Sequence, residues 1–189
     1  MDFEIRLERI NSIVHNFRDG NHEPYDLAED EPSVICGNIC IEDESIGSIR
    51  LYELCNDKNF FSLLDSVDED CSIIARVICG KSGAVLKKYL SGESEYDPVY
   101  ILDQIAIDRE FRNRGIGSVI IKNLLKMINY QFGRGSTVFL CASDYESAEQ
   151  YGFESSEYEE GKNRLIEFYK KLGFRIVKDN IMVYTEKDT

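Results

Sequence analysis

The sequence predicts a mixed α/β (α+β) domain in which one sheet is flanked by helices. Three observations support this fold class. Strand-like apolar runs fill much of the first 55 residues. A buried strand, a short glycine-bearing turn and an amphipathic helix follow one another over residues 99–132. The rest of the chain repeats strand, helix and strand, an order typical of a sheet covered by helices.

Three strands are expected in the N-terminal part of the chain. Residues 3–10 alternate apolar and charged side chains, a pattern typical of an edge or half-buried strand. Two further apolar runs, 33–41 and 46–55, flank the polar segment 42–45, and this pattern predicts a hairpin. The polar segment 11–32 between the first two strands has room for one short helix at most.

The segment between residues 59 and 90 changes to helical character. Acidic residues at 68–70 suit the start of a helix, where they complement the helix dipole. The apolar side chains of that helix are Ile73, Ile74, Val77 and Ile78. Another short helix is expected over residues 84–90, before a polar loop that leads to the next strand.

The C-terminal half begins with a buried strand over residues 99–107 and an amphipathic helix over 116–132. Gly133 and Gly135 are expected to end this helix. A further buried strand is expected over residues 136–142.

Residues 143–163 are rich in Glu, Ser and Tyr, and we expect a long loop there. A loop of that length within a compact domain is usually functional or mobile. A helix over residues 164–172, with Gly173 as its C-terminal cap, and one or two strands over 174–184 complete the expected order.

The turn Arg112-Asn113-Arg114-Gly115-Ile116-Gly117 has the composition of an anion-binding site. Its glycines let the backbone approach a ligand closely, and the free N–H groups of a first helical turn attract negative charge. The sequence lacks the Gly-Lys-Ser/Thr of a nucleotide P-loop and the three glycines of a dinucleotide-binding turn. A phosphate-bearing cofactor is therefore the expected ligand.

This hexapeptide resembles the Arg/Gln-x-x-Gly-x-Gly/Ala signature of the GNAT superfamily of acetyl-CoA-dependent N-acetyltransferases. The preceding strand, Tyr100 to Asp108, and the later Phe168-Tyr169-Lys170-Lys171-Leu172-Gly173-Phe174 also resemble that family. The resemblance extends over residues 99–183 and implies a mostly antiparallel central sheet that is splayed at the cofactor strand. It implies transfer of an acetyl group from acetyl-CoA to a primary amine of a small molecule or peptide, by direct attack in a ternary complex.

The resemblance also implies which residues bind acetyl-CoA. The backbone of the cofactor strand would pair with the pantetheine arm, and the amides of the turn would hold the pyrophosphate. Relatives often carry an asparagine seven residues before the tyrosine that matches Tyr169. In this sequence Asn163 lies one residue after that position. The expected cofactor-binding residues are Ile105, Ala106, Ile107, Arg112, Asn113, Arg114, Gly115, Ile116, Gly117, Ser118 and Asn163.

Two residues are candidates for acid–base catalysis. Tyr169 matches the tyrosine that many relatives use to protonate the coenzyme A thiolate, and a phenol stays protonated at neutral pH. The alternative is a core tyrosine with a satisfied hydroxyl group. Asp103 lies where several relatives carry a glutamate that accepts the amine proton, and the alternative is a carboxylate that only orients the substrate. The acidic segments 68–70 and 154–160 either bind a cationic substrate or are solvated surface.

The expected domain organisation is a single N-acetyltransferase domain over residues 1–189. Its N-terminal half, 1–98, contains an insertion at about 56–98 on the acceptor side, and residues 99–189 form the acetyl-CoA-binding core. The family normally places two helices between its first and second strands. Here that segment is short, and helical character follows the third strand instead. We therefore expect the acceptor side to be rebuilt from the insertion.

Composition limits the partners. The net charge of −13 argues against nucleic acid and is compatible with a cationic amine. The six cysteines contain no Cys-x-x-Cys pair and lie mostly in apolar runs, so we expect no metal site and a reducing compartment. No apolar stretch is long enough to span a membrane and no signal peptide is apparent, so a cytoplasmic protein is expected, with a homodimer left open. The rival hypothesis is a non-catalytic acyl-CoA-binding sensor or interaction module.

Overall fold

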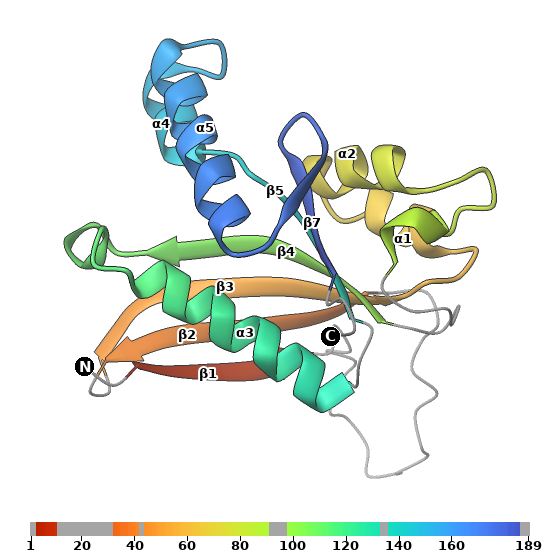
Figure 1. Ribbon diagram of the computed structural model, residues 1–189, viewed down its shortest axis with the longest axis horizontal. Helices are drawn as coiled ribbons and strands as arrows, with labels where there is room; N and C mark the ends of the chain where they lie inside the picture. Colours follow the sequence, from red (N-terminus) through yellow and green to blue (C-terminus); the bar gives the residue numbers. More distant parts are fainter. Residues whose placement is uncertain (1–2, 11–31, 42–43, 91–97, 133–135, 186–189) are drawn as a thin grey trace, which may run out of the picture.

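A seven-stranded sheet forms the centre of the computed structural model of this protein, which describes residues 3–10, 32–41, 44–90, 98–132 and 136–185 (Figure 1). The strand order is β1-β2-β3-β4-β5-β7-β6, and only the β4–β5 pair is parallel among the described strands. This mixed, mostly antiparallel sheet confirms the predicted fold class. The strands are β1 (Phe3–Ile10), β2 (Ser33–Ile41), β3 (Glu44–Cys55), β4 (Pro98–Ile107), β5 (Thr137–Cys141), β6 (Arg175–Lys178) and β7 (Ile181–Thr185).

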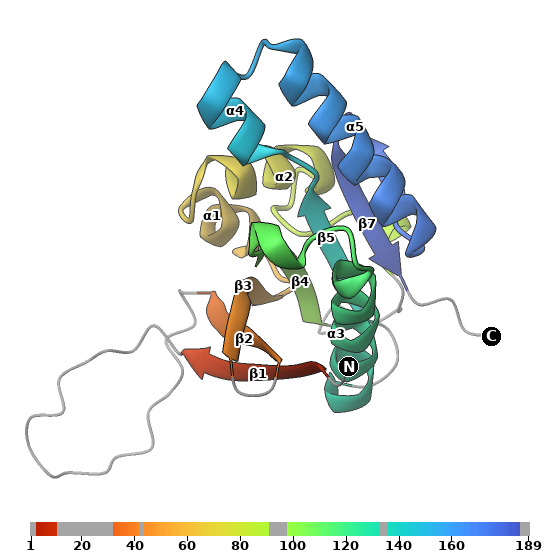
Figure 2. The same ribbon diagram turned by 90° about the vertical axis from the view of Figure 1, so that its left-hand side faces the viewer.

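Helices cover both faces of the sheet (Figure 2). α1 and α2 lie on one face, and α3 and α5 lie on the other. The period-2 alternation of strand side chains divides the core accordingly. On β4, Val99 and Ile101 pack with α1 and α2, whereas Tyr100 and Leu102 pack with α3 and α5. The helices are α1 (Phe60–Asp65), α2 (Glu69–Ile78), α3 (Ile116–Phe132), α4 (Tyr145–Tyr151) and α5 (Ser156–Lys171).

A β-bulge interrupts β4 at Asp103. Leu102 pairs with Leu51 of β3 and Gln104 pairs with Arg50, so Asp103 is the extra residue of the bulge. Beyond it, Ile105 packs on the α3 side as Leu102 does. Bulges of this kind redirect a side chain locally and are frequent beside active sites.

The sheet splays apart where β4 passes the bulge. β4 pairs with β5 only from Val99–Thr137 to Leu102–Leu140. From Asp103 to Ile107, β4 pairs with β3 alone among the described strands. The expected splay at the cofactor strand is therefore present, and it leaves one edge of β4 without a neighbouring strand.

The prediction of a long loop over residues 143–163 is wrong. The structure has α4 there, followed by α5, which begins eight residues before the predicted helix start. Both helices are capped locally, because the side chain of Asp144 accepts from the Ser147 amide and that of Ser155 accepts from the Tyr158 amide. The apolar stripe of this region is sparse, and so hydrophobic periodicity alone missed both helices.

Smaller differences concern the other helices. The expected helix over 84–90 is only a 3₁₀ turn, Lys87–Tyr89. The helix expected to begin at the acidic residues 68–70 is α2, with Asp68 as its N-cap, whereas α1 before it was not predicted as a separate helix. The predicted helix within 11–32 and the glycines predicted to end α3 lie outside the described residues. Among the helices that the structure describes, none has the length and apolarity required to span a bilayer.

Candidate active site

The turn between β4 and α3 presents a row of free backbone amides. The N–H groups of residues 113–117 donate to no acceptor in the described part of the chain, whereas the Ser118 and Val119 amides already bond to the Gly115 carbonyl. Asn113 and Gly115 have φ values of 60° and 78°, and left-handed residues in such a turn curve the backbone so that its N–H groups converge. A Cβ added at Gly115 would meet nothing within 4 Å. The turn therefore has the form of an anion cradle with open space in front of it.

The unpaired edge of β4 adjoins this cradle. The Asp108 amide bonds to the Ile46 carbonyl of β3 at 2.9 Å, and the Ala106 carbonyl also faces β3, 2.2 Å from where a Cβ on Gly47 would lie. Because polar groups alternate along a strand, those of Ile105 and Ile107 point to the open edge. Of the three strand positions expected to bind the cofactor, Ile105 and Ile107 thus present main-chain groups there, while Ala106 is turned to the sheet.

The Arg112 side chain already has two partners within the chain. Its Nε donates to the Ile107 carbonyl at 2.6 Å, and its NH1 group pairs with Glu146 of α4 at 2.5 Å. Arg109 pairs with the same carboxylate, and the two guanidinium groups hold the pKa of Glu146 below its ordinary value. Glu146 therefore links α4 to the cradle. The guanidinium of Arg114 lies 5.6 Å from the centre of the Phe111 ring.

Tyr169 lies in the core between α5 and the sheet, with 6% of its surface exposed. Its ring makes edge contacts with Phe168 at 5.1 Å and Phe174 at 5.4 Å between ring centres. Phe168 in turn borders the cradle, since a Cβ on Gly117 would lie 3.4 Å from its ring. The Tyr169 hydroxyl forms no hydrogen bond with any described residue, and burial raises its pKa above the ordinary value. It is thus a protonated phenol without the satisfied hydroxyl expected of a purely structural tyrosine.

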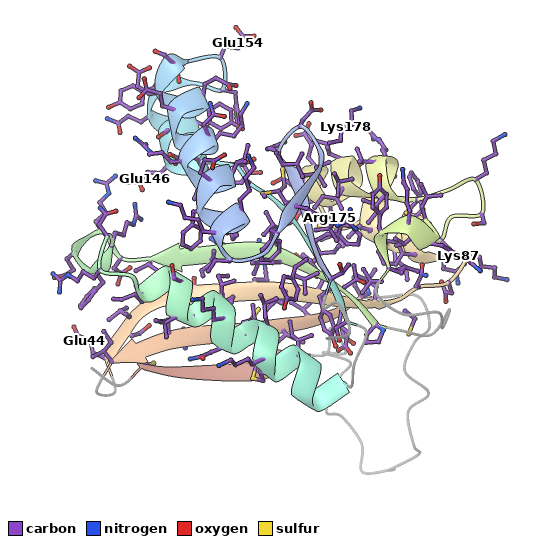
Figure 3. All side chains as sticks on the ribbon, viewed as in Figure 1. Glu44, Lys87, Glu146, Glu154, Arg175 and Lys178 are labelled. Atoms are coloured by element: carbon purple, nitrogen blue, oxygen red, sulfur yellow. The ribbon has the colours of Figure 1, made fainter. Side chains whose placement is uncertain are left out.

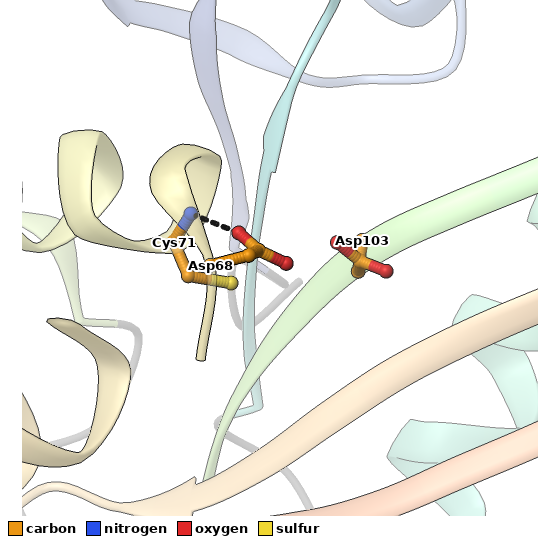
Figure 4. Close-up of side chains that lie close together, drawn as sticks. All are labelled: Asp68, Cys71 and Asp103. Atoms are coloured by element: carbon orange, nitrogen blue, oxygen red, sulfur yellow. Dashed lines mark hydrogen bonds between the residues drawn. The ribbon is translucent and has the colours of Figure 1, made fainter. Parts of the chain in front are cut away.

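Asp103 projects from the bulge toward α2 (Figure 4). The Arg50 guanidinium from β3 donates to its carboxylate, which is 8% exposed. Burial raises the pKa of Asp103, Arg50 opposes that increase, and the negative charge of Asp68 adds to it. The sequence-predicted base is therefore a partly desolvated carboxylate whose pKa is raised overall, with the Arg50 guanidinium working against that increase.

The α2 N-terminus brings further acidic groups to Asp103. Asp68 accepts from the Cys71 amide at 2.8 Å, and one oxygen of each carboxylate and the Cys71 sulfur all lie within 4.8 Å of one another. Such a trio has the spacing of metal ligands. The Arg50 guanidinium already supplies a positive charge to Asp103, however, and burial raises the pKa of the Cys71 thiol well above neutrality. Both features make this trio a poor metal site, because a metal ion binds the thiolate rather than the thiol.

Asp70 extends the same acidic group toward α4. Burial, Asp68, Asp103 and Glu69 together raise the pKa of Asp70 to about 6. Its carboxylate accepts a hydrogen bond from the hydroxyl of Tyr145, the first residue of α4. We call Asp68, Asp70 and Asp103 the carboxylate group of the site. The sequence singled out all three residues but gave no sign that they lie together.

Two further sequence predictions concern residues on or next to α5. Asn163 is exposed on α5, and its side chain forms no hydrogen bond with any described residue. The acidic segment 154–160 lies on α5 and the turn before it, apart from the carboxylate group. Sequence reasoning missed Arg50, Tyr145 and Glu146, because isolated charged or aromatic residues carry no local signal of a partner distant in sequence.

No protein-family model and no curated protein matches the sequence. Several solved structures resemble the fold. The AtaTR complex bound with AcCoA matches with a TM-score of 0.43 and 12% identity over 95% of this chain and 92% of that one. Arabidopsis thaliana NAA60, in complex with a bisubstrate analogue, matches with a TM-score of 0.42 and 14% identity over 80% and 74% of the two chains.

A GNAT family acetyltransferase from Elizabethkingia anophelis, with acetyl-CoA bound, matches with a TM-score of 0.37 and 15% identity over 93% and 78% of the two chains. In another match, to a mutant of the AtaT toxin bound to the C-terminus of the antitoxin AtaR, this chain spans only 65% of that chain. All of these likenesses are distant.

Proposed function

We propose that this chain is an N-acetyltransferase that moves the acetyl group of acetyl-CoA to a positively charged primary amine. One observation carries the proposal. The anion cradle of residues 113–117, the unpaired edge at Ile105 and Ile107, and the Asp103 carboxylate follow one another along a single strand and turn. A phosphate-bearing, amide-containing cofactor and an amine would therefore meet along that line.

Acetyl-CoA would supply the acetyl thioester. The free amides of 113–117 would hold its pyrophosphate, and the outward groups of Ile105 and the N–H of Ile107 would pair with the amides of its pantetheine arm, since the Ile107 carbonyl already accepts from Arg112. An N–H on the same edge would polarise the thioester carbonyl. The bound ammonium would first lose one proton to water, which leaves a lone pair on the nitrogen. Asp103 would take a second proton from that nitrogen as the C–N bond forms, and the Tyr169 hydroxyl would give a proton to the sulfur as the C–S bond breaks.

The charge on the acceptor follows from the carboxylate group. Asp68 and Asp103 lie together beside α2, their negative charges act on Asp70, and among the described ion pairs of these three residues Arg50 pairs with Asp103 alone. The overall charge of −13 would add long-range attraction for an ammonium group. A primary amine flanked by further positive charge fits this environment best.

Cofactor binding is tested at Gly115, with Gly152 as the matched control. Both glycines have positive φ, 78° and 91°, and at both a Cβ would meet nothing within 4 Å. Alanine should therefore be strained at each, and Gly152, whose ψ is 153°, lies in a region that essentially only glycine adopts, so its replacement is a stringent control for strain. We expect Gly115→Ala to weaken coenzyme A binding at least tenfold in calorimetry, because the added methyl group enters the cradle, and Gly152→Ala to leave it unchanged. Equal affinities in the two folded variants would refute the proposed cradle.

Amine binding is expected to depend on pH through Asp70. Its pKa of about 6 means that the carboxylate loses charge below that pH, so the Kd of a cationic acceptor should rise as pH falls from 7 to 5. Asp70→Asn should abolish this dependence of the Kd on pH. Because a raised pKa makes ionisation destabilising, stability should fall as pH rises from about 4 to about 6, and Asp70→Asn should melt higher at pH 7. Calorimetry with coenzyme A bound and melting curves measure both effects, and an unchanged pH step in the variant would exclude Asp70.

The rival function, a non-catalytic acyl-CoA-binding module, shares the cradle but not the acid and base. Release of free thiol from acetyl-CoA with a panel of amines separates the two. Turnover with any cationic amine supports the enzyme. Tight coenzyme A binding without turnover on polyamines, aminoglycosides or lysine peptides supports the module.

A further inference from the structure

α4 and the turn that joins it to α5 carry an exposed aromatic surface that the proposed chemistry does not use. Phe153, Tyr151 and Tyr145 are 60%, 53% and 44% exposed, the largest values among the large apolar side chains of the described residues. All three lie within nine residues of one another. We call residues 144–161 the acidic aromatic arm. Figures 1 and 2 show that α4 and α5 pack side by side and extend away from the sheet.

The aromatic surface is held in place by local structure. Gly152 ends α4 with a φ of 91°, a conformation that L side chains rarely adopt, and the chain turns back there. The Phe153 ring then meets Tyr158 at 5.3 Å and Tyr145 at 6.3 Å between ring centres, both edge-on. Tyr158 is buried, so it supports Phe153 from below. An exposed ring fixed by two others is a preformed contact surface.

The negative charge of the arm favours a basic partner. Residues 144–161 include seven acidic residues and no Lys, Arg or His. The acidic residues are Asp144, Glu146, Glu149, Glu154, Glu157, Glu159 and Glu160. A second copy of this chain or a nucleic acid would bring like charge to the surface, which disfavours both. A basic partner is complementary to it.

Two contacts relate this surface to cations and to the site. The Lys162 ammonium lies 5.5 Å from the centre of the Tyr158 ring, so an aromatic ring of the arm already receives a cation within the chain. The Tyr145 hydroxyl bonds to Asp70 of the carboxylate group. The aromatic surface therefore continues into the place where the acceptor amine is proposed to bind.

We propose that the acidic aromatic arm docks a basic peptide segment, with Lys or Arg side chains lying over Phe153 and Tyr151 and pairing with Glu154 and Glu157. The idea that the docked peptide is the acetyl acceptor rests on the proposed function. Docking itself does not, because it requires only the surface of α4 and α5.

Anisotropy of a fluorescein-labelled nonapeptide of alternating Lys, Arg and Gly, added to the full-length chain without acetyl-CoA, tests the docking. A peptide of equal length with Glu and Asp in place of Lys and Arg is the ligand control. The variants are Phe153→Ala and the double variant Glu154→Gln with Glu157→Gln. The matched controls are Ile176→Ala, at an apolar residue 43% exposed on β6, and Glu44→Gln at the start of β3. Figure 3 shows Glu154 at the top of the molecule and Glu44 well away from it at the lower left.

The basic peptide should bind and the acidic peptide should not. Phe153→Ala should weaken binding about three- to tenfold through lost cation–π and apolar contact. The double glutamine variant should weaken it and flatten its dependence on salt, while both control variants leave it unchanged. Melting curves verify that each variant is folded.

Several results would overturn the docking. They are equal binding of the two peptides, an equal loss in the control variants, or a dimer in sedimentation that Phe153→Ala dissociates. If small amines are acetylated but the basic peptide fails to bind, the docking is wrong and the proposed function stands. If the peptide binds as expected but coenzyme A does not, the proposed function is wrong and the docking stands.

Discussion

Replacing Tyr169 with phenylalanine is expected to lower the turnover rate of acetyl transfer by roughly 10²–10⁴-fold, the range for a positioned acid or base. The ring would keep its edge contacts with Phe168 and Phe174, so the core should stay packed. Because the hydroxyl forms no hydrogen bond with a described residue, its removal should change the melting temperature little. Coenzyme A affinity should also be unchanged.

Tyr89 provides the matched control for this experiment. It is also a buried tyrosine, 8% exposed, with an edge contact at 6.2 Å to Phe139, but it packs on the α1–α2 face of the sheet. Tyr89→Phe should leave the rate unaltered. Wild-type turnover in a folded Tyr169→Phe protein, with an acceptor whose chemical step is rate-limiting, would remove Tyr169 from the mechanism.

The parts of the fold that follow from local patterns were predictable from the sequence. Alternation over residues 3–10 and the apolar run that became β4 identified strands, because strand burial imposes a period of two or a continuous apolar run. The glycine-bearing turn was predictable for a similar reason, since Gly115 adopts a positive φ that few other residues tolerate. The α4–α5 region was not, because its helices depend on caps and on packing between them rather than on a broad apolar stripe. Gly161 is an example, since a Cβ there would strike Asp144 at the start of α4.

The chemistry of the candidate site was predictable only residue by residue. Asp103 and Tyr169 were found through their position relative to family motifs, but neither motif indicates a neighbour. Arg50 and Asp103 lie on two different strands and are 53 residues apart in the sequence. The bulge that brings them together arises from the register of β3 against β4. The bond between Tyr145 and Asp70 spans 75 residues. Contacts of this kind arise from tertiary packing, which a single sequence does not encode in any local pattern.

The second large effect is expected at Asp103. Asp103→Asn should reduce kcat by roughly 10²–10⁴-fold, because the amide cannot accept the proton of the attacking amine. Coenzyme A affinity should be retained, since the cradle lies beyond Ile107 and does not involve the carboxylate. If Asp103 only orients the substrate, the same variant should instead raise KM for the amine with little change in kcat. Steady-state kinetics with both substrates varied distinguish the two roles.

Arg50 gives the base assignment an independent test through pH. The guanidinium lowers the pKa of Asp103 against the effect of burial, so Arg50→Gln should raise that pKa. The acidic limb of the pH profile of kcat/KM should then move to higher pH, because the carboxylate must be ionised to act as a base. Arg76→Gln, on the exposed side of α2, is the charge-matched control and should leave the limb in place. An unshifted limb in Arg50→Gln, together with near-normal kcat in Asp103→Asn, would assign proton removal to Asp68 or to water rather than to Asp103.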